Sequence, residues 1–127
     1  MQEQHLFEYA VIRVVPRVER EEFLNIGIIL FCTSRNFLEL KYELDTERFR
    51  IFTEGMDTGI FEDNLHAFQR ICKGGTAAGP IGLLPARERF RWITATRSSI
   101  LQTSKAHSGF CTDAAAALDR LMQQLVY

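Results

Sequence analysis

The chain has 127 residues and a formal net charge of −1 at pH 7, a size that predicts one domain over residues 1–127. Hydrophobic residues make up 46% of it, which argues against a disordered protein. No segment approaches the roughly 20 apolar residues of a membrane helix, and the N-terminus lacks the pattern of a secretory signal. We therefore expect a cytoplasmic protein that does not enter membranes.

The first third of the sequence predicts three strands. Residues 6–16 and 23–32 are apolar on both faces, a pattern typical of central strands that are covered on both sides. Residues 37–44 alternate, with leucines and a tyrosine facing inward and charged residues facing outward. Only four residues separate the second and third strands, so we expect an antiparallel hairpin.

The remaining residues favour helices with one extended segment between them. Asp45 is positioned to cap a short helix over 46–52, and an apolar stripe recurs at helical spacing through 58–73. After these helices the sequence predicts, in chain order, a flexible loop at 74–86, a turn of helix at 86–93, extended chain at 98–110 and a helix over 113–127. This order predicts an α+β domain, with an antiparallel sheet of three to five strands covered by two or three helices.

Cysteine and histidine spacings favour neither a disulfide framework nor a metal site. Cys32, Cys72 and Cys111 are odd in number, and the chain has no C-x-x-C motif. We expect all three to be small core residues in a reducing compartment, and we expect no cofactor.

Two polar features interrupt the second strand. Asn25 and Gly27 are expected on one face of an otherwise apolar strand, where they form either a small recess for a ligand or a packing contact. Glu19, Glu21 and Glu22 lie at the entrance of this strand. They could bind a cation or act as acid/base groups, but a solvated charge cluster is the simpler interpretation.

Charge is distributed unevenly along the chain. Residues 1–63 contain seven basic and thirteen acidic residues, a net charge of −6, whereas residues 64–127 have a net charge of +5. Either the second half binds an anionic partner or the two halves attract each other within the fold. The candidate basic surface comprises Arg70, Arg87, Arg91, Arg97 and Lys105, with Trp92 between the arginines as a core residue or a base-stacking one.

Two stretches resemble the signatures of a bacterial family of unknown function, DUF3037. They are "YAVIRVVPRVEREEFLNIGIILF" at 9–31 and "ERFRWITATRSSILQTSKAHSGF" at 88–110. The matching positions are Glu22, Asn25, Gly27, Arg89, Trp92, Arg97, Ser98, Gln102, His107 and Gly109.

The resemblance implies a small soluble bacterial protein with no assigned catalytic residues. Members of the family are often encoded beside a HipA-like kinase, which implies a protein partner. We therefore expect a non-enzymatic binding or accessory subunit that contacts such a kinase or forms a homo-oligomer. The alternative is a protein that binds nucleic acid or a phosphoryl ligand, or a small enzyme that acts on nucleic acid, through the basic segment 87–107.

A last hypothesis joins the polar strand residues to the late extended segment. If residues 98–110 pair with the N-terminal strands, a shallow ligand cleft is expected from Asn25, Arg91, Arg97, Ser98, Gln102 and His107. There His107 would bind an anion or exchange a proton near neutral pH. A buried polar network that fixes the packing of the late segment is the competing interpretation.

Overall fold

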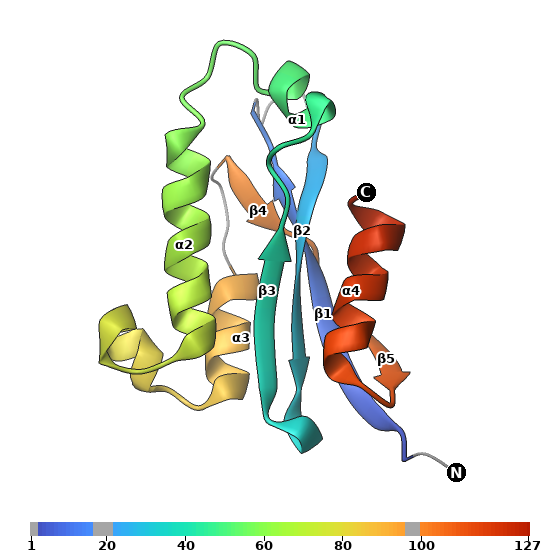
Figure 1. Ribbon diagram of the computed structural model, residues 1–127. Coiled ribbons are helices and arrows are strands. Elements are labelled where there is room, and N and C mark those ends of the chain that lie inside the picture. Colours follow the sequence, from blue (N-terminus) through green and yellow to red (C-terminus); the bar gives the residue numbers. More distant parts are fainter. Residues whose placement is uncertain (1–2, 17–21, 96–99) are drawn as a thin grey trace.

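A computed structural model describes residues 3–16, 22–95 and 100–127 of the chain (Figure 1). The described residues form one antiparallel five-stranded sheet with helices on both faces, which confirms the predicted α+β class. The order of the strands is β3-β2-β1-β4, and β5 pairs with β1 on the same side as β4.

The three N-terminal strands lie where the sequence predicts them. They are β1 (His5–Val14), β2 (Leu24–Cys32) and β3 (Phe37–Tyr42). A short 3-10 turn, η2 (Thr33–Arg35), connects β2 to β3, and Asn36 completes the turn in the left-handed conformation with φ of 50°. The predicted antiparallel hairpin is therefore confirmed.

The late extended segment completes the sheet as two short strands, β4 (Leu101–Thr103) and β5 (His107–Cys111). Ser104 lies between them and is buried. Its hydroxyl accepts a hydrogen bond from Val11 N at 2.9 Å, while its own N–H donates to Val11 O at 2.8 Å. Because Ser104 satisfies both backbone groups of Val11, β4 and β5 follow the same edge of β1 despite the interruption.

Helices cover both faces of the sheet (Figure 1). α1 (Glu47–Phe52), α2 (Gly59–Lys73) and α3 (Ala86–Thr94) lie on one face, and α4 (Ala114–Leu125) lies on the other. The predicted stripe of α2 is buried, and so are inward residues of α4. The largest fully buried side chains include Ile12, Ile29 and Phe61 on the first face and Ile28, Leu30 and Leu118 on the second.

Two local expectations are wrong. Thr46, rather than Asp45, caps α1, because its hydroxyl accepts a hydrogen bond from Phe49 N at 3.0 Å. The loop predicted at 74–86 contains 3-10 turns, η3 (Thr76–Leu83), kinked at Gly79. Of the two interpretations left open for Trp92, its 47% exposure excludes the one that places it in the core.

A β-bulge separates Asn25 from Gly27. Ile12 pairs with Gly27 but Arg13 pairs with Asn25, so β2 contains one extra residue at this point. Gly27 therefore lies on the α2 face, whereas Asn25 lies on the α4 face and donates from Nδ2 to Leu125 O at 3.1 Å. The expectation that the two residues share a face is wrong. A Cβ at position 27 would lie 2.5 Å from Lys41 O, so glycine is required by the close approach of β3.

The cysteines are buried and free, as predicted. Burial raises the pKa of the Cys72 thiol to about 12, an effect that Arg89 partly opposes and Glu39 reinforces. Burial also raises the pKa of Cys111, which lies beside Cys32. Within the described ranges, no helix has the length and apolar character needed to cross a membrane.

We expect the protein to lose stability as the pH rises above about 9. A raised thiol pKa means that the unfolded chain loses its proton first, so the stabilisation is complete below the unfolded pKa and declines towards the folded one. For Cys72 the loss between pH 7 and pH 10 should be about 1–1.5 kcal/mol. Urea unfolding at both pH values measures it. Cys72→Ala should reduce the loss by that amount, and an unchanged difference in this variant would contradict the assignment.

Candidate functional site

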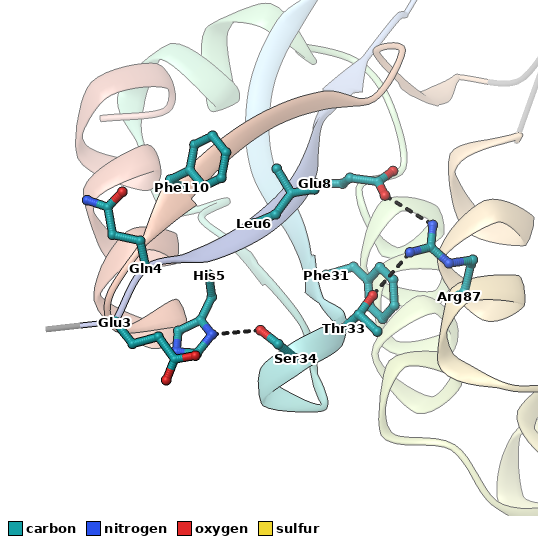
Figure 2. A pocket seen from close by; sticks show the side chains of 10 residues that line it. All are labelled: Glu3, Gln4, His5, Leu6, Glu8, Phe31, Thr33, Ser34, Arg87 and Phe110. Atoms are coloured by element: carbon teal, nitrogen blue, oxygen red, sulfur yellow. Dashed lines mark hydrogen bonds and ion pairs between the residues drawn. The ribbon is translucent and has the colours of Figure 1, made fainter.

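A pocket of about 540 Å³ lies where the α3 side of the sheet is left uncovered (Figure 2). Leu6 and Glu8 share this face of β1 with Ala10 and Ile12, which are fully buried. The packed core does not extend to the start of β1, so Leu6 is 54% exposed and its partner on β5, Phe110, is 64% exposed. We name the surface made by Leu6, Glu8, Phe31, Arg87 and Phe110 the β1–β5 face.

Arg87 is held in a fixed orientation on the β1–β5 face. It projects from the first turn of α3 and donates from Nη1 to Glu8 Oε1 at 3.1 Å and from Nη2 to Thr33 Oγ1 at 3.1 Å. Its guanidinium carbon lies 5.2 Å from the centre of the Phe31 ring, within the range of a cation–π contact. The exposed ion pair contributes little to stability, so its main effect is to position the charge.

His5 and Ser34 form a second polar contact in the pocket. The imidazole Nδ1 lies 2.7 Å from the Ser34 hydroxyl, and Figure 2 shows both side chains among those that line the pocket. Nucleophilic serines are activated by a histidine in this way, but the histidine is then oriented by a third group. Among the hydrogen bonds of the described residues, none orients the second nitrogen of His5.

The arginines of α3 differ in their surroundings. Arg89 is partly buried and donates to three carbonyls, those of Leu84 at 2.9 Å, Ile71 at 2.8 Å and Cys72 at 2.7 Å. The last two belong to the C-terminal turn of α2, where backbone carbonyls lack partners within the helix. Arg91 is exposed one turn beyond Arg87. The helical spacing predicted for Arg87 and Arg91 is confirmed. Arg89, between them, instead caps the C-terminal carbonyls of α2.

Other predicted basic residues lie apart from the pocket. Arg70 is exposed in the last turn of α2, and Lys105 is exposed in the turn between β4 and β5. Arg97 and Ser98 lie outside the described residues, as do Glu19 and Glu21.

The structure brings together two members of the hypothesised cleft. Asn25 and Gln102 flank Arg13 from the neighbouring strands β2 and β4. Arg13 lies beneath the Phe23 ring, with 4.2 Å between the guanidinium carbon and the ring centre. Its Nε and the Asn25 Oδ1 are shielded from solvent and have no hydrogen-bond partner among the residues that the structure describes.

His107 lies elsewhere on the same face of the sheet. It pairs with Tyr9 on β1 and packs on that ring, with 5.4 Å between the ring centres. Tyr9 and Arg13 are four residues apart in an extended strand, a separation of roughly 13 Å. His107 is exposed at that distance from the Asn25–Arg13–Gln102 row.

Comparison with protein families assigns the chain. The model of the family described as "Protein of unknown function (DUF3037)" matches residues 9–126. This chain belongs to the DUF3037 family. Comparisons with curated proteins and with solved structures gave no match.

Several DUF3037 signature positions have structural roles in this chain. Asn25 donates to the last turn of α4, and Gly27 admits the backbone of β3. A Cβ at Gly109 would lie 2.7 Å from the Phe7 ring, so this glycine makes room for a buried aromatic side chain. Together with Arg89, these residues fix contacts between elements that are distant in sequence.

Sequence reasoning missed the residues of the β1–β5 face except Arg87. Glu8 gives the clearest available signal, because it is the one carboxylate among the residues of β1. Exposure of Leu6 and Phe110 has no comparable signal, since their pattern is that of core residues.

We expect Arg89→Met to lower the free energy of unfolding by about 2–4 kcal/mol, because it removes a charged donor from partly buried carbonyls. Arg91→Met, in the same helix but exposed, should change it by less than about 0.5 kcal/mol. Urea denaturation of both variants measures the difference. Equal effects would show that Arg89 does not stabilise the junction of α2 and α3.

Proposed function

We propose that this DUF3037 protein is a non-enzymatic binding protein that contacts a partner protein through the β1–β5 face. The observation that supports this most strongly is the exposure of Leu6 and Phe110, which oppose each other on neighbouring strands beside the pocket. Two adjacent large apolar side chains on a folded surface mark an interaction site more often than scattered single ones do.

The chemistry around the apolar pair also fits a protein interface. Aromatic residues and arginine are enriched in such interfaces, with polar groups at the rim. Here Phe110 and Leu6 line the same pocket as Arg87, whose side chain is already ordered by Glu8 and Thr33. Because its orientation is fixed before binding, Arg87 would lose less conformational entropy when it meets a carboxylate or carbonyl of the partner.

For the partner we propose a HipA-like kinase, on the basis of the family resemblance, and for the compartment the bacterial cytoplasm. The face would bind the kinase as an accessory subunit, without catalysing a reaction itself. The pocket is open and partly apolar, whereas small molecules usually occupy deep cavities, so its shape fits a protein partner better than a small molecule.

We expect the double variant Leu6→Ser/Phe110→Ser to weaken binding to a purified HipA-like kinase of the same bacterium by about 30-fold or more, since exposed anchors of this kind dominate binding free energies. Isothermal titration calorimetry with the wild-type chain gives the reference. A matched control is Ile51→Ser, because Ile51 is 66% exposed on α1, outside the β1–β5 face.

The melting temperatures of both variants should equal that of the wild type within a few degrees, because the replaced side chains are exposed. Absence of any binding between the wild-type chain and the kinase would refute the kinase as partner. Equal weakening by Ile51→Ser would refute the β1–β5 face as the contact.

Nucleic-acid binding is the second candidate, and one observation favours it. Trp92 is 47% exposed beside Arg91 on α3, and Arg70 and Lys73 are exposed at the end of the neighbouring helix α2. An exposed aromatic ring and exposed cations on the same and on the neighbouring helix are the residue types that stack bases and contact phosphates.

This alternative predicts binding of single-stranded RNA or DNA that weakens steeply between about 50 and about 200 mM salt, as counterions return to the phosphates. Fluorescence anisotropy with a labelled oligonucleotide measures it. Trp92→Ala and Arg91→Gln should each reduce the affinity, whereas Arg35→Gln, on the exposed η2 turn, should not. No binding at the lower salt concentration would eliminate the alternative.

A further inference from the structure

The outer edge of β5 lacks the features that usually prevent strands from pairing. In the described part of the chain, β5 has β1 as its one partner strand, and Figure 1 shows no element on its other side. Its sequence, HSGFC, contains no Lys, Arg, Asp, Glu or Pro. Natural edge strands are commonly protected by charged residues or proline, because exposed backbone N–H and C=O groups otherwise recruit another strand.

The opposite edge of the same sheet is protected. β3 carries Glu39 and Lys41 as exposed charged residues, and Lys41 forms an ion pair with Asp119 of α4. α2 and α4 also contact β3 from the two faces. The contrast between the two edges indicates that β5, rather than β3, is available for pairing.

The ends of β5 carry charges of opposite sign. Lys105 precedes the strand and Asp113 follows it, each four residues from Gly109 at the centre, and both are exposed. In an antiparallel pair of two β5 strands centred on Gly109, Lys105 of each copy lies opposite Asp113 of the other. Complementary charges at both ends would favour this register over a shifted one.

The side chains between these charges are also compatible with self-pairing. Phe110 of one copy would lie opposite the small Ser108 of the other, and Gly109 would meet Gly109 without a side chain. No like charges face each other within the strand. Both copies would present Phe110 and Leu6 on the same face of a continuous sheet, because opposed residues in an antiparallel pair share a face.

We infer that this protein forms a two-fold symmetric homodimer by antiparallel pairing of β5 with β5 of a second copy. The inference is independent of the proposed kinase partner, and its test uses this chain alone. A five-residue strand supports a small interface, so we expect a reversible dimer with a dissociation constant on the order of 1–100 µM.

Analytical ultracentrifugation over a range from about 1 to about 300 µM tests the assembly, since it brackets the expected dissociation constant. The mass should rise from that of a monomer to that of a dimer. Hydrogen exchange at both ends of the range should show amides of residues 107–111 protected at high concentration, while those of β3 remain unchanged. A monomer throughout the range would overturn the inference.

Charge variants test the register. Lys105→Glu should raise the dissociation constant about 5-fold or more, because it places a carboxylate opposite Asp113 of the other copy. Adding Asp113→Asn should restore much of the affinity, since asparagine removes the charge yet still caps α4. Lys73→Glu, an equal charge change on α2, is the control.

Each of these results either supports or overturns the β5 dimer. Weakening by Lys105→Glu, restoration by the double change and no effect of Lys73→Glu support the β5 dimer. A dimer that Lys105→Glu leaves unchanged, or one that protects amides outside 107–111, would overturn it in favour of another interface.

Discussion

The central position of β1 determines the rest of the structure. It pairs with β2 on one side and with both β4 and β5 on the other, and helices cover its two faces. A strand in this position must be apolar on both faces, which is what Ala10, Val11 and Ile12 provide. Because β4 and β5 come from the end of the chain, burial of β1 joins the N-terminal hairpin to the last quarter of the sequence.

The same arrangement leaves the first residues of β1 available for function. Ala10 and Ile12 are buried beneath the helices, whereas Leu6 and Glu8 on the same side of the strand are not. The transition from covered to uncovered sheet produces the pocket and places Glu8 within reach of Arg87. The β1–β5 face therefore results from how far α3 extends over the sheet rather than from a motif of its own.

Sequence patterns predicted the elements because burial imposes periodicity. The doubly apolar strands, the stripe of α2 and the Asp113 cap of α4 depend on residues close together in the chain. The bulge beside Asn25 was not predictable in this way, since it depends on the register between β1 and β2. Pairing of Arg87 with Glu8, 79 residues away, likewise requires the folded sheet. Leu6 is exposed because α3 does not extend over it, and the extent of a helix elsewhere in the chain leaves no periodic pattern in the sequence around Leu6.

The arginine-rich segment shows why charge alone does not identify a site. Arg87 and Arg91 are four residues apart and lie on one side of α3, whereas Arg89 projects from another side of the helix. Arg89 binds carbonyls at the end of α2, Arg87 binds Glu8, and Arg91 is exposed. A guanidinium that already satisfies its donors within the fold contributes little to the capture of an anion, whereas an ordered one with an exposed edge can contact a protein surface. What each arginine can bind therefore depends on the groups around it, and these are determined by its position on α3.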